Sequence, residues 1–316
     1  MTAPDNTPLA PLCGLGIDAG GTQTRWALAR ASGEIVADGR VAGMTALLMN
    51  TDSGRQHVRE VVADLAGAVA AVGRPGRVYA GLTGFGEGED SLRALIATAL
   101  GVDAGGVTLA SDIEIACLDL YAPGEGYVVY AGTGSIAAFI DAAGTLHRAG
   151  GRGVVLDDAG GGFWIAREAL RHIWRVEDER PESWRDSPMA CALFERIGGD
   201  DWAHTRRFVY GSTIGEARGE IGKLALAVAA VAGIDPDARR ILDAAGCELA
   251  RLGRAMTLRF GSRPVTLTGR VAELHPAIAE AMRAALPDSI PLAVRASDAH
   301  FAAARIAARG MAVPRH

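Results

Sequence analysis

Residues 14–29 read GLGIDAGGTQTRWALA. Two apolar runs flank a glycine-rich turn, so we predict a β-hairpin over residues 12–30. Consecutive glycines let backbone N–H groups approach an anion, and the neighbouring hydroxyls add donors. The turn therefore fits a polyphosphate, although an ordinary hairpin turn accounts for the same residues. The candidate nucleotide-binding residues are Asp18, Gly20, Gly21, Thr22 and Thr24, and the Asp18 carboxylate could hold Mg²⁺ through water.

Two other phosphate-binding motifs are excluded by the sequence. Gly14-Leu15-Gly16 looks like the start of a dinucleotide fingerprint. That fingerprint needs a helix N-terminus after the glycines, whereas Thr24–Ala29 continues as a strand. No GxxxxGK[ST] pattern occurs in the chain, which excludes a P-loop enzyme.

A second hairpin is predicted over residues 126–140, GYVVYAGTGSIAAFI, which resembles the first one and forms a weak internal repeat. Its turn supplies four further candidate nucleotide-binding residues, Gly132, Thr133, Gly134 and Ser135. Two glycine-hydroxyl turns in two halves of the chain could hold one triphosphate from both sides. The pair is stronger evidence than either turn alone.

The rest of the chain alternates between strand and helix patterns. We predict a strand after Asp38-Gly39 and an α/β organisation with mixed sheets. A chain of 316 residues exceeds the size of most single cores, so we expect two lobes. The other predicted strands cover 77–82, 107–110 and 265–267, and the predicted helices cover 56–72, 91–100, 187–258 with breaks at 198–199 and 235–236, and 298–309.

Three further segments carry candidate site residues. Asp112 follows the strand at 107–110 and is the candidate general base, while a helix N-cap is the alternative interpretation. The glycine-rich loop 150–162 contains Asp157 and Asp158, which could accept hydrogen bonds from sugar hydroxyls, or it is a plain surface loop. Thr268 and Gly269 follow the last strand, where a turn of small residues could receive an adenine ring.

The amino-acid composition indicates which kinds of binding partner the protein can have. The net charge of −5 comes without long like-charge runs, which argues against nucleic acid or an anionic membrane and favours a small molecule. Residues 1–13 lack the pattern of a signal peptide, so we expect a cytoplasmic protein. The longest uncharged apolar stretch, 224–234, is too short for a membrane span and predicts a buried helix. The four cysteines are far apart and should be free and mostly buried, and no histidine pair has the spacing of a helical zinc site.

Taken in order, these segments resemble the ATPase family that joins N-acetylglucosamine and glucosamine kinases to the ATPase activators of benzoyl-CoA reductase and 2-hydroxyacyl-CoA dehydratase, the BadF/BadG/BcrA/BcrD type. The resemblance covers nearly the whole chain. It is carried by DAGGTQTRWAL, LTGFGEG, SDIEIA, VVYAGTGSIA, GGRGVVLDDAGGGFWIAREAL and LTGRVA. The order and spacing of these motifs are specific, although each motif alone is not.

The resemblance implies an actin-like, ribonuclease-H-like sugar kinase fold with ATP in an interlobe cleft. The lobes would cover residues 11–121, joined by a C-terminal helix 296–310, and 122–295 with a helical insertion. The implied activity is transfer of the ATP γ-phosphoryl group to the 6-hydroxyl of an amino sugar, N-acetylglucosamine or glucosamine, with Mg²⁺ as cofactor and a homodimer as the expected assembly. Asp112 would be the catalytic base, and Thr83, Gly134 and Asp158 would contact the sugar.

The chain departs from the family pattern at four positions. Ala159 stands where the pattern GDExS has an acidic residue, Arg152 where tryptophan is common, Ile136 where a sugar-contacting asparagine can occur, and Arg270 where a second glycine is usual. Two alternatives to a kinase are an activator ATPase with an iron–sulfur cluster bridging a dimer and a sugar sensor with an altered site. The widely separated cysteines offer no paired cluster ligands, and we expect no helix-turn-helix before the first lobe.

Overall fold

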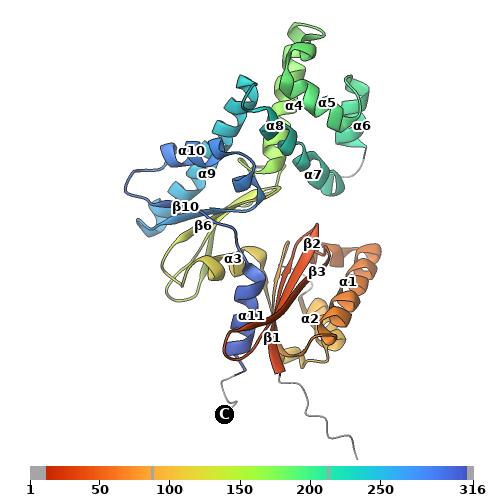
Figure 1. The fold of residues 1–316 in the computed structure, drawn as a ribbon, viewed down its shortest axis with the longest axis vertical. Helices are drawn as coiled ribbons and strands as arrows, with labels where there is room; N and C mark the ends of the chain where they lie inside the picture. Colours follow the sequence, from red (N-terminus) through yellow and green to blue (C-terminus); the bar gives the residue numbers. More distant parts are fainter. Residues whose placement is uncertain (1–11, 87–88, 212–213, 312–316) are drawn as a thin grey trace, which may run out of the picture. The chain divides into compact units, whose positions relative to one another are not determined.

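The computed structural model describes residues 12–86, 89–211 and 214–311. The chain divides into two compact units. The first contains the described residues up to Leu120 together with those from Asp298 onward, and the second is Tyr121–Ser297. Each unit is built on one mixed five-stranded sheet (Figure 1).

The sheet of the first unit has the order β3-β2-β1-β4-β5. The predicted hairpin is confirmed, since β1 and β2 pair antiparallel across the glycine-rich turn, and β4 and β5 run parallel to β1. The strands are β1 (Leu12–Ala19), β2 (Gln23–Ala29), β3 (Ile35–Ala42), β4 (Arg74–Leu82) and β5 (Val107–Ser111). The helices are η1 (Ala46–Asn50), α1 (Asp52–Ala70), α2 (Glu89–Leu100), η2 (Ala104–Gly106), α3 (Asp112–Leu120) and α11 (Ala299–Arg309).

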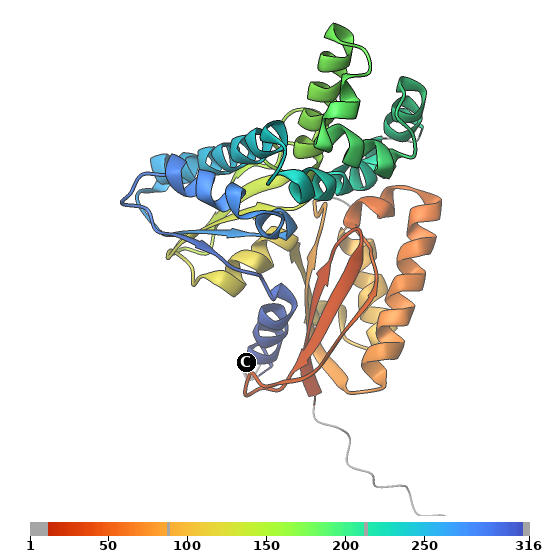
Figure 2. The same cartoon turned by 45° about the horizontal axis from the view of Figure 1, so that its top comes forward.

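Alternate residues of β1 face opposite sides of this sheet. Leu15 and Ile17 are fully buried in the core that includes residues of α1 and α2. Gly14 and Gly16 point to the other side, where α11 packs directly on the strand (Figures 1 and 2). A Cβ atom on Gly16 would lie 2.1 Å from the backbone oxygen of His300. These two glycines therefore serve close helix packing, which agrees with the exclusion of a dinucleotide fingerprint.

The sheet of the second unit has the order β10-β9-β6-β7-β8. The second predicted hairpin is confirmed as the antiparallel pair β6 and β7. The strands are β6 (Tyr127–Ala131), β7 (Ser135–Ile140), β8 (Leu146–Gly150), β9 (Val265–Thr268) and β10 (Leu292–Val294). The helices are α4 (Gly162–Glu179), η3 (Ser183–Asp186), α5 (Pro188–Ile197), α6 (Trp202–Tyr210), α7 (Ile214–Lys223), α8 (Ala225–Val231), α9 (Pro236–Phe260), η4 (Arg270–Glu273) and α10 (Pro276–Ala285).

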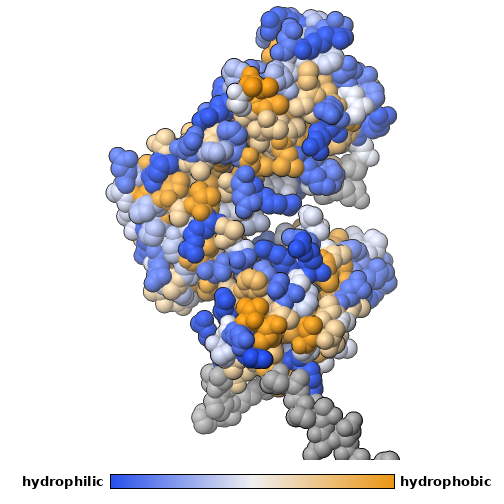
Figure 3. Space-filling model, in the orientation of Figure 1, coloured by the Kyte–Doolittle hydropathy of each residue, from blue (hydrophilic) through white to orange (hydrophobic). Residues whose placement is uncertain are grey.

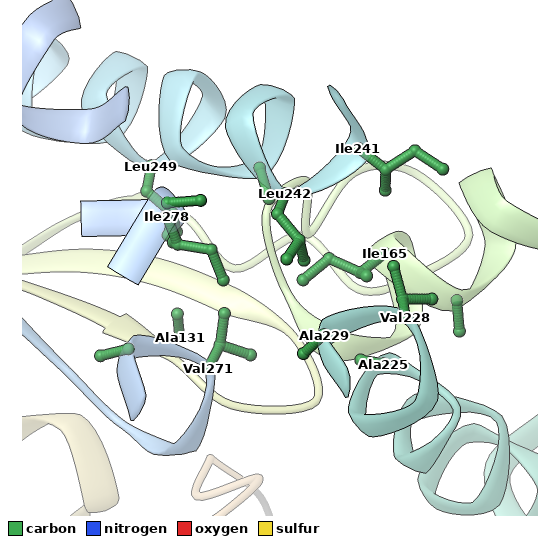
Figure 4. Packing of buried hydrophobic residues seen from close by; sticks show 14 of the residues in the cluster. Ala131, Ile165, Ala225, Val228, Ala229, Ile241, Leu242, Leu249, Val271 and Ile278 are labelled. Atoms are coloured by element: carbon green, nitrogen blue, oxygen red, sulfur yellow. The ribbon is translucent and has the colours of Figure 1, made fainter. Parts of the chain in front are cut away.

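Aliphatic side chains from several helices form the core of the second unit. Leu242 and Leu249 of α9, Ile165 of α4 and Val228 of α8 are all buried in one cluster (Figure 4). The long helix α9 begins at a capping Asp235, whose side chain accepts from the N–H groups of residues 237 and 238. On the viewed surface, hydrophilic residues alternate with small apolar patches (Figure 3).

Two expectations are corrected by the structure. Cys191 and Cys247 are exposed, so only half of the cysteines are buried. The predicted buried helix at 224–234 is shorter, since α8 covers only Ala225–Val231. Leu226 within this helix and Ile234 beyond its end are both exposed. Strands β8 and β10 and helix α10 were not predicted. Within the described residues, no helix is both long and apolar enough to cross a membrane.

Candidate functional site

Three strands of the first unit end at one edge of its sheet. Strands β1, β4 and β5 are parallel, with Ala19 paired to Leu82 and Leu82 paired to Ser111. The residues that follow these strand ends are Gly20, Thr83 and Asp112. In parallel sheets the carboxyl ends of the strands are the usual location of ligand sites. The sheet thus brings the glycine turn and the candidate base to the same edge.

The Asp112 carboxylate is held by two donors. The Thr83 hydroxyl donates to Asp112 Oδ2 at 2.7 Å, and the Ile113 backbone N–H donates to Asp112 Oδ1 at 2.8 Å. The Thr83 backbone is itself fixed, since its N–H donates to the Ala19 oxygen at 3.0 Å and its carbonyl accepts from Ala46 N–H at 3.0 Å. Asp112 is also the first residue of α3. Asp112 can therefore be the first residue of the helix and still present its carboxylate as a base.

The turn between β1 and β2 leaves room beside its glycines. The Gly20 N–H donates to the Gln23 oxygen at 3.1 Å, which closes the turn. A Cβ atom on Gly21 would meet only Thr45 Cγ2 at 3.7 Å, an ordinary contact, and Gly21 has no positive φ. Neither packing nor backbone conformation therefore requires glycine there, which is the expected property of a residue that a ligand approaches closely. Thr22 is exposed at the turn, whereas the Thr24 side chain is fully buried.

Asp18 lies opposite Arg25 in the hairpin register, and their side chains form an ion pair. Arg25 Nη2 is 2.6 Å from Asp18 Oδ2. Burial raises the pKa of Asp18 above its usual range, Arg25 opposes that rise, and the nearby Asp112 charge adds to it. Two carboxylates and one guanidinium leave a local excess of negative charge, which fits a divalent cation. Because Mg²⁺ binds through few protein carboxylates, phosphate oxygens and water, Asp18 fits the predicted role.

The turn of the second unit is tied to helix α4. Gly132 N–H donates to the Gly134 oxygen at 2.9 Å, and the Gly132 and Thr133 carbonyls accept from the N–H groups of Gly162 and Phe163. The Ser135 hydroxyl is buried and donates to the Ala159 oxygen at 2.7 Å. Here packing does demand glycine, because a Cβ atom on Gly134 would lie 2.1 Å from Asp158 Oδ2. The turn is thus held against the loop 150–162.

The two aspartates of that loop have different surroundings. Asp157 faces Arg251, with 3.2 Å between Asp157 Oδ2 and Arg251 Nη2. Asp158 is 4% exposed, has a φ of 54°, and accepts from the Gly153 N–H at 3.0 Å. Burial raises the pKa of Asp158, while the Gly153 hydrogen bond and the charge of Arg218 lower it. Asp158 organises the loop, and its Oδ2 is the atom nearest to a Cβ added at Gly134.

The predicted adenosine segment begins at Thr268, the last residue of β9. Thr268 is buried, and its hydroxyl has no hydrogen-bond partner among the described residues. Gly269 has a φ of 95°, and a Cβ atom there would lie 2.5 Å from the Ala131 oxygen, so glycine is required. Arg270, which follows this glycine, is exposed to solvent. Within the described residues no cluster of three metal-ligating side chains occurs.

Sequence reasoning did not identify Arg25 or Arg218. The register of a hairpin with its turn at residues 20–22 could have indicated Arg25, since it places residue 25 beside residue 18. Nothing in the sequence indicates Arg218, which reaches Asp158 from 60 positions away along the chain on helix α7.

Comparison with known proteins identifies the family and the fold. A sequence profile of the BadF/BadG/BcrA/BcrD ATPase family matches residues 15–295. No curated protein matches the chain. Among solved structures, a provisionally assigned N-acetylglucosamine kinase from Porphyromonas gingivalis is 18% identical with a TM-score of 0.73, and the match covers 95% of this chain and 99% of the other.

Two other structures show the same architecture. A provisionally assigned N-acetylglucosamine kinase from Chromobacterium violaceum is 22% identical with a TM-score of 0.66, covering 91% of this chain and 96% of the other. A ROK family glucokinase from Streptomyces griseus, solved with glucose and AMPPNP, is 18% identical with a TM-score of 0.54, covering 95% and 98%. The predicted α/β, actin-like sugar kinase fold with two mixed sheets is confirmed.

Proposed function

This chain belongs to the BadF/BadG/BcrA/BcrD ATPase family, and we propose that it is an ATP-dependent kinase that phosphorylates the 6-hydroxyl of an amino sugar. N-acetylglucosamine and glucosamine are the proposed substrates. Family membership implies the use of ATP, and the likeness to proteins designated N-acetylglucosamine kinases supports this choice of sugar.

The observation that carries the proposal is the oriented carboxylate of Asp112. A hydroxyl nucleophile must lose its proton as it attacks, and a positioned carboxylate can accept that proton. The Thr83 hydroxyl and the Ile113 N–H fix both carboxylate oxygens without neutralising their charge. In the proposed step a bond forms between the sugar O6 and the γ-phosphorus, the bond from this phosphorus to the β-phosphate oxygen breaks, ADP leaves, and Asp112 takes the proton.

The glycine turns are proposed to bind the polyphosphate. In the first unit, the turn over Gly20, Gly21 and Thr22 is proposed to offer the backbone N–H groups of Gly21 and Thr22 and one hydroxyl around a position with spare room. In the second unit, Gly132, Thr133 and Gly134 offer a similar turn, and Thr268 and Gly269 are proposed to lie near the adenosine. Mg²⁺ bound by Asp18 through water would neutralise charge that develops on the phosphates.

Asp158 is proposed to read the sugar. Its Oδ1 accepts from the Gly153 N–H, while its Oδ2 lies beside Gly134 of the glycine turn. Arg152 and Ala159 give this loop a different charge from that of the family pattern. We therefore propose that the preferred hexosamine is the property in which this chain differs most from the family's kinases.

A coupled assay of ADP release across a panel of sugars tests the proposal. We expect release to depend on N-acetylglucosamine or glucosamine and to be much lower with glucose or with no sugar. ATP hydrolysis that is equal with and without every hexosamine would favour the activator ATPase. Sugar binding without any turnover would favour the sensor.

A further inference from the structure

One arginine of the helical segment lies against the glycine turn of the second unit. Arg218 belongs to α7, and its Nη2 is 3.6 Å from Asp158 Oδ2. A Cβ atom on Gly134 would lie 3.0 Å from the same Nη2 atom. The guanidinium is therefore beside both the turn and the buried aspartate.

The hydrogen bonds of this arginine are incomplete. Arg218 Nε is buried and has no hydrogen-bond partner among the described residues. The separation of 3.6 Å from Asp158 is an ion-pair distance, longer than a hydrogen bond. A buried N–H without an acceptor is unfavourable. The Arg218 side chain as a whole is 38% exposed, so its terminal N–H groups are accessible to an anion.

The negative charge of Asp158 would repel a phosphate at the glycine turn, and Arg218 lies where it can offset that repulsion. The Asp158 side chain is only 5% exposed, and Oδ2 lies close against Gly134. A phosphate on the turn 132–135 would meet this carboxylate as a like charge, which is unfavourable at short range. A guanidinium between the Asp158 carboxylate and the phosphate attracts both of them and so offsets their mutual repulsion. The planar arrangement of its N–H donors also matches the spacing of phosphate oxygens.

We propose that Arg218 is a phosphate-binding residue, contacting the polyphosphate of ATP at the turn 132–135. The inference rests on the proposed function, because it requires that the turn binds nucleotide. Arg218 then differs from the glycines of the turn, since it contributes charge as well as hydrogen bonds. It should discriminate nucleotides by the number of their phosphates.

Calorimetric titration of the full chain with Mg²⁺ and either ATP or AMP tests this inference. We expect Arg218→Gln to weaken ATP binding roughly 10- to 100-fold while changing AMP binding less than about threefold, and Arg218→Lys to lie between. The matched control is Arg196→Gln, which removes the same charge from an exposed position on α5. Equal ATP affinity in wild type and Arg218→Gln, or equal losses for ATP and AMP, would overturn the inference.

A double variant separates direct contact from simple charge balance. If Arg218 acts only by neutralising Asp158, then Asp158→Asn combined with Arg218→Gln should restore wild-type ATP affinity, and that result would also overturn the inference. We expect the double variant to stay weak. Failure of the wild-type protein to bind ATP would instead refute the proposed function, and the inference would fall with it.

Discussion

The Thr83 hydroxyl donates a 2.7 Å hydrogen bond to Oδ2 of Asp112, joining the ends of two neighbouring parallel strands. This contact fixes the direction of the carboxylate before any substrate arrives. A base that is already oriented loses little freedom at the moment of reaction, which is how positioning lowers a barrier. The first two predictions follow from this contact.

Asp112→Asn should lower kcat by about 10²-fold or more, because an amide cannot accept the hydroxyl proton. The affinity for ATP should change little, since the variant keeps the size of the side chain and the hydrogen bond to the first turn of α3. Steady-state kinetics and nucleotide titration on the same preparation check both halves. An Asn variant with wild-type kcat would remove the assignment of the base.

Thr83→Val should lower kcat about tenfold, because it removes one hydrogen bond to Asp112 while keeping the shape of the side chain. Thr83→Ser keeps the hydroxyl and should retain most of the rate. Thr83 is also a predicted sugar contact. If the loss appears in the sugar KM alone and kcat is unchanged, Thr83 binds the sugar and does not position the base.

Gly21→Val should abolish stabilisation by ATP while leaving the chain folded. The space beside Gly21 tolerates a side chain, so the melting temperature without nucleotide should change little, whereas a branched side chain would occupy the proposed phosphate position. The control is Gly67→Ala, an exposed position inside α1 with no atom within 4 Å of the new Cβ. It should stabilise the protein by about 0.5–1 kcal/mol and preserve ATP binding. ATP stabilisation that survives in Gly21→Val would show that the hairpin turn has no part in binding.

Some elements and site residues could be predicted from the sequence alone, and others could not. The glycine turns interrupt apolar strands, so both hairpins were predictable, and so was the position of Asp112 directly after a strand. Strand β8 was not predicted because it is short and its residues 146–150 are polar or half-exposed. Strand β10 was not predicted because it has only three residues. Arg218 could not be found, because its role depends on the packing of α7 against a loop that is distant in sequence. The exposed Cys191 and Cys247 show the same limit, since burial depends on which helix face packs.

His300 should make stability depend on pH in a defined window. Burial and the charge of Arg25 lower its pKa to about 4 from 6.5, although Asp298, Asp38 and Asp119 oppose this. Between pH 6.5 and 4 the unfolded chain therefore binds more protons than the folded one, so the free energy of unfolding should fall as the pH drops through this range.

The slope that His300 contributes should be at most about 1.4 kcal/mol per pH unit. Urea unfolding at several pH values in wild type and His300→Gln checks this, with His57→Gln, an exposed position, as control. The His300 variant should lose part of the slope and the control should keep it. Identical pH dependence in all three proteins would mean that the histidine is protonated in the folded state as readily as in the unfolded one.

The most direct measurement is the position of the phosphate on the sugar product. The protein is incubated with Mg²⁺, ATP and N-acetylglucosamine or glucosamine, with the matched 6-deoxy sugars as controls, and the products are identified by mass spectrometry and phosphorus NMR. We expect a 6-phosphate ester and ADP in equal amounts from at least one hexosamine and neither product from its 6-deoxy analogue. No phosphorylated sugar from either hexosamine, or a phosphate ester that also forms with the 6-deoxy sugars, would contradict it.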